Sequence, residues 1–80
     1  MRRTPQQYLD LPYHRVWERR EDDAEPYWLV RLAEIPEVVG DGITRTQAEG
    51  ALLECLLDYV TYRQAEDLDV PDPAPEAAAG

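Results

Sequence analysis

The chain has 80 residues and carries 17 acidic residues against 8 basic ones, all arginine, so its formal net charge is −9. That length allows one small domain, whose core rarely supplies more than about 3–5 kcal/mol of stability unaided. The single cysteine excludes an intrachain disulfide, and the acidic balance argues against direct nucleic-acid binding, which needs a cationic surface. We therefore expect self-association as the remaining way to bury apolar surface. We interpret the charge as a source of solubility or as a match for a basic partner.

The sequence shows no segment that predicts a membrane or secretory location. No apolar run approaches the ~20 residues of a transmembrane helix, and residues 1–7 lack the apolar segment of a signal peptide. Together with the lone cysteine, which fits a reducing compartment, this pattern predicts a cytoplasmic protein.

The N-terminal part leads into one predicted strand. Residues 1–7 are polar, and we expect them to be flexible. Residues 8–12 fit either a short turn of helix or an extended lead-in, and their pattern does not choose between the two. Residues 13–19 alternate between two faces with a period of two, which is typical of a strand. Both faces carry apolar groups, so the pattern leaves the buried face open.

A charged segment separates this strand from the next. Residues 20–26 predict a hairpin loop, and they contain four carboxylates, those of Glu21, Asp22, Asp23 and Glu25. The order of these acids lacks the spaced pattern of a calcium loop. We therefore expect a solvated loop and no metal.

The strongest strand pattern follows the loop. Residues 27–34 alternate cleanly, and Trp28, Val30 and Leu32 form the more apolar face, which we expect to pack against a helix. Residues 38–39 predict a short third strand.

A turn and a helix start come next. We expect Gly40 and Gly42 to form a tight turn with positive φ values. Thr44 has the character of an N-cap, since its hydroxyl can accept from the backbone N–H of Gln47 while the Gln47 side chain reaches back. These signals predict a helix over residues 45–64.

The predicted helix carries two apolar stripes. The first forms one broad arc that we expect to lie on the sheet, and it consists of Ala48, Ala51, Leu52, Cys55, Leu56, Tyr59 and Tyr62. The second, made of Leu53, Leu57 and Val60, is centred about 130° away, so one sheet cannot easily cover both. Either residues 8–12 fold over the second stripe, or the stripe is a subunit interface. Gly50 lies beside it, where a close approach would favour a glycine.

The C-terminal part shows no helix or strand pattern. Residues 70–73 (Val-Pro-Asp-Pro) are stiff and extended, and residues 74–80 predict a disordered tail. We therefore place the domain at residues 8–73. The predicted fold class is α+β, with a small antiparallel sheet of about three strands, one long helix packed on it and a disordered acidic tail rich in Pro and Ala.

No enzyme signature emerges from the side chains. His14 is the only histidine, and no partner at a recognised spacing makes it a catalytic base. Cys55 lies on the core-facing arc, where a thiol behaves as a small hydrophobe. Trp17, Tyr27 and Trp28 could form a stacking platform for single-stranded RNA, but without surrounding positive charge a core or interface role is favoured. We expect no catalytic residue, no metal and no cofactor.

Four segments, in order along the chain, resemble the HicB-like family of antitoxin domains. Residues 8–13 resemble the Tyr-Leu-x-Leu-Pro-Tyr opening of one branch, and residues 27–36 resemble the strand that ends in the family's Pro-Glu-Leu-Pro-Gly segment. Residues 42–48 resemble the Gly-Asp-Thr-x-x-x-Ala helix start, and residues 70–73 match the Val-Pro-x-Pro that follows the helix. The resemblance covers roughly residues 8–73.

The chain also departs from the family pattern. Ile35 and Pro36 stand at the family's Leu-Pro, but Glu37 replaces the usual Gly, Val38 replaces a frequent Cys, and Ile43 replaces the Asp of Gly-Asp-Thr. We therefore expect a turn of different shape in this region.

The resemblance implies a degraded ribonuclease-H-like fold without catalytic carboxylates. It also implies a partner, a small basic toxin with a double-stranded-RNA-binding-like fold that cleaves mRNA and whose active histidine the antitoxin masks. An acidic chain suits a basic partner. Full-length members commonly carry a C-terminal DNA-binding domain, but no basic helix follows residue 73 here. We therefore expect no direct DNA binding by this chain alone.

These observations predict an antitoxin-like protein that inhibits by occlusion. We expect the contact on the hairpin loop and the exposed side of the sheet, with steering charges at Glu21, Asp22, Asp23 and Glu25. The alternative is an orphan HicB-like domain that acts as an oligomeric scaffold or regulatory subunit without a toxin. A nuclease or RNA-binding role would need a basic or carboxylate-lined groove, which the sequence does not indicate.

Overall fold

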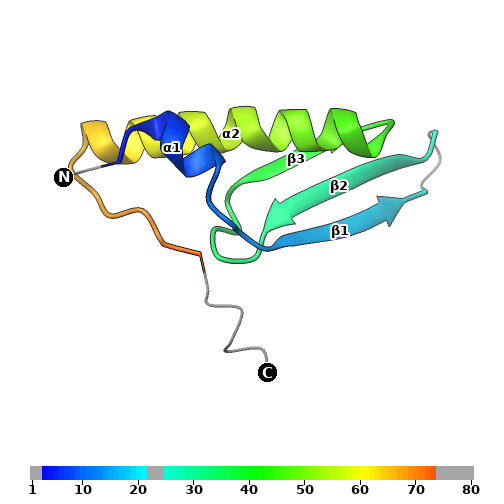
Figure 1. Cartoon of the computed structure of the whole chain (residues 1–80). Coiled ribbons are helices and arrows are strands. Elements are labelled where there is room, and N and C mark those ends of the chain that lie inside the picture. Colours follow the sequence, from blue (N-terminus) through cyan, green and yellow to red (C-terminus); the bar gives the residue numbers. More distant parts are fainter. Residues whose placement is uncertain (1–2, 22–24, 74–80) are drawn as a thin grey trace, which may run out of the picture.

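The computed structural model describes residues 3–21 and 25–73. Their elements are α1 (Pro5–Leu9), β1 (Arg15–Arg20), β2 (Tyr27–Leu32), β3 (Val39–Gly42) and α2 (Arg45–Ala65). The three strands form one antiparallel sheet, and the long helix α2 lies along one face of it (Figure 1). The predicted α+β arrangement is therefore confirmed. The tail expected at residues 74–80 lies outside the described residues.

The sheet has the order β1-β2-β3, with β2 in the middle. Val30 of β2 pairs with Trp17 of β1 on one side and with Gly40 of β3 on the other. Because side chains alternate along a strand, Val30 and Leu32 point to the same face, and both are fully buried against the helix. The expected helix-facing side of the second strand is thus correct.

The third strand and the helix approach each other to backbone contact. A Cβ atom on Gly40 would lie 2.5 Å from the Ala48 carbonyl oxygen and closer still to the Leu52 amide nitrogen, and one on Gly42 would lie 2.7 Å from the Ala48 amide nitrogen. The expected turn with positive φ values at Gly40 and Gly42 is wrong, because both residues lie in β3 and no described glycine has a positive φ. They are glycines because α2 crosses β3 without room for a side chain.

The start of α2 is capped nearly as expected. The Thr44 hydroxyl accepts from the Gln47 backbone N–H at 3.1 Å. The Gln47 side chain reaches one residue further back than predicted, where its Oε1 accepts from the Ile43 N–H at 3.0 Å. This arrangement satisfies two backbone donors that the helix itself leaves free.

A complete capping box starts the short helix α1. The Thr4 hydroxyl accepts from the Gln7 N–H at 3.4 Å, and Gln7 Oε1 accepts from the Thr4 N–H at 2.8 Å. Pro5 occupies the first turn, where its missing N–H has no cost. Residues 3–7, which we expected to be flexible, are therefore organised by this cap.

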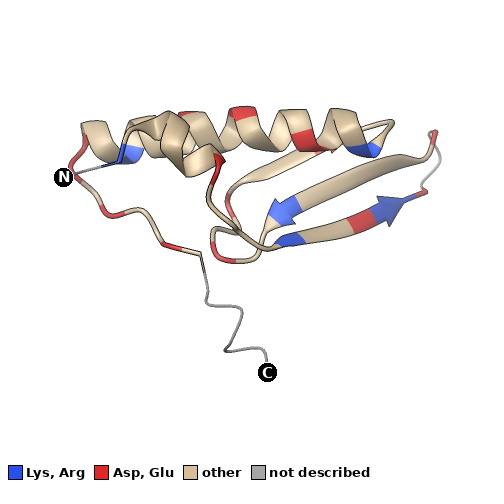
Figure 2. Cartoon of the chain, viewed as in Figure 1, with Lys and Arg blue, Asp and Glu red and all other residues tan. Residues whose placement is uncertain are grey.

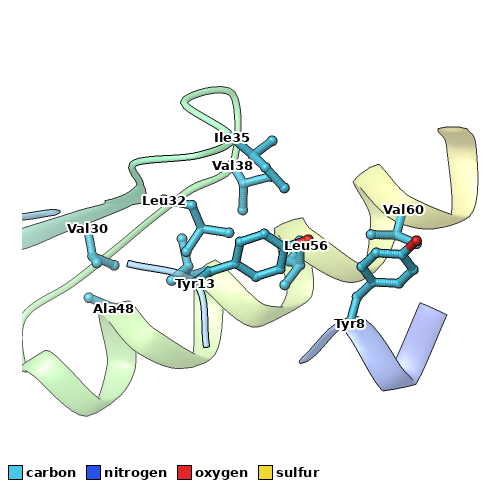
Figure 3. Close-up of a cluster of buried hydrophobic side chains, with 10 residues drawn as sticks. Tyr8, Tyr13, Val30, Leu32, Ile35, Val38, Ala48, Leu56 and Val60 are labelled. Carbon is cyan, nitrogen blue, oxygen red and sulfur yellow. The ribbon is translucent and has the colours of Figure 1, made fainter. Parts of the chain in front are cut away.

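The core extends from the sheet to α1. Its buried side chains are those of Tyr8, Tyr13, Val30, Leu32, Ile35, Val38, Ala48, Leu52, Leu56 and Val60. Figure 3 shows the Tyr8 ring from α1 facing Val60 near the C-terminal end of α2. One continuous core thus reaches from the sheet to α1.

The buried stripe of α2 differs from the predicted arc. Ala48, Leu52, Leu56 and Val60 are four residues apart, and each such step turns about 40° around the helix. The stripe therefore winds from the sheet towards α1. Tyr62, expected on the sheet side, is 61% exposed.

The three residues of the second apolar stripe are not buried to the same extent. Val60 is fully buried in the core beneath Tyr8. The prediction that it belongs to a subunit interface is therefore wrong. Leu53 and Leu57 are half-buried. Gly50 has no atom of the described residues within 4 Å of where its Cβ would lie, apart from its own helix backbone and neighbours. The fold-over alternative thus accounts for Val60, and α1 is the segment that covers it.

The chain after α2 turns back onto the fold. The Tyr13 hydroxyl donates to the Pro71 carbonyl at 2.5 Å, and Arg63 Nε donates to the Asp69 carbonyl at 2.9 Å. Arg3 lies 3.1 Å from the Asp72 carboxylate. Residues 69–72 are therefore held against the N-terminal part of the chain.

Candidate functional site

Two of the four predicted steering charges, Glu21 and Glu25, are described by the structure and lie at one end of the sheet. Glu21 and Glu25 are exposed on the connection between β1 and β2, whereas Asp22 and Asp23 lie outside the described residues. Arg19 Nε lies 3.5 Å from the Glu21 carboxylate, a loose and exposed ion pair of the kind that contributes little energy. Both acids therefore remain available to a charged partner.

The histidine joins two parts of the backbone. Glu34 Oε1 accepts from the His14 backbone N–H at 3.0 Å, and Glu34 Oε2 lies 2.7 Å from His14 Nδ1. The Glu34 side chain is 8% exposed, so this contact fixes the start of β1 to the segment after β2. The arrangement supports a structural role for His14.

No cluster of metal-binding side chains forms in the part of the chain that the structure describes. Within residues 3–21 and 25–73, no group of three or more His, Cys, Asp or Glu side chains could hold a metal ion. Cys55 is half-buried and packs against the core.

An aromatic groove lies beside the helix. The helix α2 packs over β3 and β2 but not over β1, so Trp17 on the helix-facing side of β1 has an open flank. Its ring meets Trp28 edge to face, with centroids 6.2 Å apart. Trp17 lines an open groove of about 370 Å³ together with Arg45, Thr46 and Glu49. We call this surface the tryptophan groove.

A guanidinium group lies on both indole rings of this groove. The Arg45 Cζ is 4.5 Å from the Trp17 centroid and 4.9 Å from the Trp28 centroid. Such cation–π contacts contribute about 0.5–1 kcal/mol when exposed. They hold the Arg45 side chain in place, while no carboxylate of a described residue lies within ion-pair distance of it.

Glu49, one of the residues that line the groove, forms an ion pair with β1. Arg15 donates two hydrogen bonds to the Glu49 carboxylate, at 2.6 Å from Nη2 and 3.1 Å from Nε. This two-point geometry is the stronger form of the Arg–carboxylate pair. The ion pair connects β1 to α2, although α2 does not pack over β1.

The structure separates the three aromatic residues that we considered as a stacking platform and assigned to a core or interface role. Trp17 and Trp28 lie together, but Tyr27 points to the other face of the sheet because it neighbours Trp28 in β2. The positive charge that we judged to be missing is supplied by Arg45, and by Arg19 at 5.1 Å from the Trp28 ring. The sequence did contain one sign that Arg45 faces the sheet. Arg45 precedes Ala48 by three residues, so the two side chains lie on the same side of the helix.

Two further surfaces remain uncovered by the described chain. On the open sheet face, Val16 and Val39 are 36% and 43% exposed and flank Arg31. On the outer side of α2, Glu54 and Asp58 are exposed. Figure 2 shows acidic positions along α2 and basic positions on β1 and β2.

Comparison of the chain with protein-family models, with curated proteins and with solved structures finds no match. None of the helices within the described ranges is long and apolar enough to cross a membrane. The functional proposal therefore depends on the family-like motifs and on the surfaces of the molecule.

Proposed function

We propose that this chain is an HicB-like antitoxin domain that binds a small basic mRNA-cleaving toxin in the cytoplasm and inhibits it by covering its active site. The observation that carries the proposal is that the family-like motifs at the two ends of the domain contact each other. Tyr13, which ends the first motif, donates to the carbonyl of Pro71 in the last. Val70 of the last motif packs against the core.

The two middle motifs also have structural roles. Ile35 of the second motif is 1% exposed, and Ala48 of the third is fully buried where α2 meets β3. Motif residues that pack together in one core support a shared architecture more strongly than their presence in the sequence alone. In this proposal the chain is a binding protein and performs no catalysis.

Charge supports a basic partner. The net charge of −9 favours encounter with a cationic protein, and Glu21 and Glu25 are exposed at the hairpin end of the sheet. Glu54 and Asp58 are two further exposed acids, and both lie on α2. We place the steering contact at the hairpin, where the acids are most concentrated in the sequence.

Affinity capture from the native cytoplasm at low and moderate salt tests whether the partner exists. Mass spectrometry should identify one small basic protein in stoichiometric amount, lost as the salt concentration rises, because exposed charges are screened. Recovery of the bait alone, as a particle of defined mass, would contradict the proposal and favour the orphan domain.

The hairpin charges allow a sharper test with that partner. Replacing Glu21 and Glu25 by Gln and Asp22 and Asp23 by Asn should slow association about tenfold and flatten its salt dependence. Stopped-flow mixing measures both quantities. The matched control replaces Glu54 by Gln and Asp58 by Asn, and an equal effect from it would place the contact on α2.

The orphan scaffold remains the second candidate because of one feature of α2. Gly50 meets none of the other described residues at its Cβ position, although a mid-helix glycine costs about 1 kcal/mol relative to alanine. Leu53 and Leu57 lie on the same side of the helix and are only half-buried. A second copy packed closely on this side would account for all three residues.

A further inference from the structure

We propose that the outer edge of β1 and the tryptophan groove bind an extended acidic peptide segment of a partner protein. The segment would pair with β1 as a fourth strand and place a carboxylate against Arg45. This inference is independent of the toxin proposal. The toxin is a basic partner placed at the hairpin, whereas the peptide is an acidic partner placed at the edge of β1.

The first support is the free backbone of β1. The strand lies at the edge of the sheet, and the Ala33 N–H donates to the His14 carbonyl at 2.8 Å. Backbone groups of an antiparallel strand alternate in direction. The N–H and C=O groups of Arg15, Trp17 and Arg19 therefore point away from β2, towards the side where a further strand can pair.

The second support is the position of the groove relative to that edge. A strand added to β1 lies about 4.8 Å from it and points every second side chain to the helix-facing side. On that side it meets Trp17 and, across the groove, Arg45 and Thr46 of α2. Backbone pairing and a side-chain pocket together are the two parts of peptide recognition by strand addition.

The third support is the charge of the site. The guanidinium of Arg45 is held between two indole rings and lacks a carboxylate partner among the described residues. It offers N–H groups that match a carboxylate in a two-point contact. The occupant that satisfies Arg45 is therefore a glutamate or aspartate side chain.

The same charges argue against a second copy of β1 as the occupant. The strand carries Arg15, Arg19 and Arg20 against one acid, Glu18. Arginine on an edge strand opposes pairing of identical strands, and like charges placed opposite each other are unfavourable. Single-stranded RNA is disfavoured as well, because it has no peptide N–H and C=O groups to pair with the outward-facing backbone of β1.

Intrinsic fluorescence provides a direct test, because Trp17 and Trp28 are the only two tryptophans and both belong to the site. The probe is an end-blocked peptide of about six residues that alternates valine and glutamate, long enough for a typical strand. We expect saturable binding with a change in emission. The same peptide with glutamine in place of glutamate should bind about tenfold more weakly or worse, because the contact loses its charge.

Variants of the protein separate the site from general charge effects. Arg45→Gln should weaken binding of the glutamate peptide about tenfold, whereas Arg31→Gln, on the opposite face of the sheet, should leave it unchanged. Arg19→Pro should also weaken binding, because it removes an N–H that points away from β2. Calorimetry measures these affinities without relying on the changed surroundings of the indole rings.

Several results would overturn the proposal. Equal binding of the glutamate and glutamine peptides, or equal loss in Arg45→Gln and Arg31→Gln, would remove Arg45 from the recognition. A fluorescence change with protein concentration, but not with peptide, would assign the edge to a second copy. Binding of a uridine oligonucleotide in place of the peptide would assign the groove to nucleic acid.

Discussion

The two halves of α2 are held by different means. The N-terminal half lies against β3 at backbone distance, through Gly40 and Gly42, and its cap at Thr44 comes from the adjoining residues. The C-terminal half is covered by Tyr8 of α1, and Gln64 donates to the Arg3 carbonyl at 2.7 Å. The first half therefore packs against its neighbours in sequence, and the second against segments from the far end of the chain.

This difference has a consequence for stability. Contacts between neighbours in sequence close short loops, whereas α1 must be brought to α2 across most of the chain at a larger entropic cost. The covering of the C-terminal half also depends on few side chains. We expect this half of α2 to open locally before the half that lies on the sheet.

The largest effect is expected where backbone meets backbone. Gly40→Ala should destabilise the fold by about 3 kcal/mol, because the new Cβ overlaps the α2 backbone at Ala48 and Leu52. Gly50→Ala, whose new methyl group meets none of the other residues within 3–21 and 25–73, should stabilise the helix by about 0.5–1 kcal/mol. Urea unfolding measures both. Similar stabilities for the two variants would show that the close contact at β3 is not required.

A smaller effect is expected under α1. Tyr8→Ala should cost about 2–3 kcal/mol through the cavity it leaves over Val60, and Tyr62→Ala, at an exposed tyrosine of the same helix end, should cost less than about 0.5 kcal/mol. Amide hydrogen exchange should then accelerate in the C-terminal half of α2 and not in its N-terminal half. Uniform acceleration along α2 would contradict the division into two halves.

The contact between Tyr13 and Pro71 gives a pH-dependent prediction. Burial, reinforced by Tyr8 and the Asp72 carboxylate, raises the pKa of the Tyr13 hydroxyl to about 12 from its usual 10.0. The neutral phenol is favoured in the fold, so its contribution to stability is complete below pH 10 and is lost as the pH rises towards about 12.

Tyr13→Phe provides the reference for this titration. At neutral pH the variant should be about 1 kcal/mol less stable, because the Pro71 carbonyl loses its donor. The difference between the two proteins should shrink between pH 10 and 12, as measured by chemical unfolding at fixed temperature. A constant difference across that range would exclude the buried phenol as the cause.

The smallest effect on the fold is expected on the outer side of α2. Leu53→Glu combined with Leu57→Glu should give monomeric or insoluble protein if this half-buried side mediates assembly, with a change in monomer stability of about 1 kcal/mol or less. The control is Thr61→Glu combined with Ala65→Glu, at exposed positions of the same helix. Light scattering measures the mass, and an unchanged assembly would make the stripe part of internal packing.

Local signals in the sequence predicted the first half of α2 and the strands beneath it. Alternation identified Val30 and Leu32, and the spacing of Thr44 and Gln47 identified the helix start. The roles of Gly40 and Gly42 were predicted wrongly. The sequence alone does not distinguish a glycine that allows close packing of a helix from a glycine that a turn requires.

The second half and the tryptophan groove were harder to predict for one reason. Val60 is buried by Tyr8, and Tyr13 is held by Pro71 at a separation of 58 residues, so periodicity along one helix cannot reveal either partner. Likewise, Arg45 meets Trp17 and Trp28 only after the sheet and helix have packed. Long-range packing, which no local pattern encodes, sets these contacts.

The measurement that tests the proposed function most directly is inhibition of RNA cleavage. The small basic protein recovered by affinity capture is incubated with an mRNA substrate and increasing amounts of this chain. Inhibition by occlusion predicts that cleavage falls linearly with added chain and stops at a fixed stoichiometry. As salt weakens the contact, the complex should dissociate and the cleavage activity should return together. Undiminished cleavage in the presence of a saturated complex would contradict the antitoxin proposal.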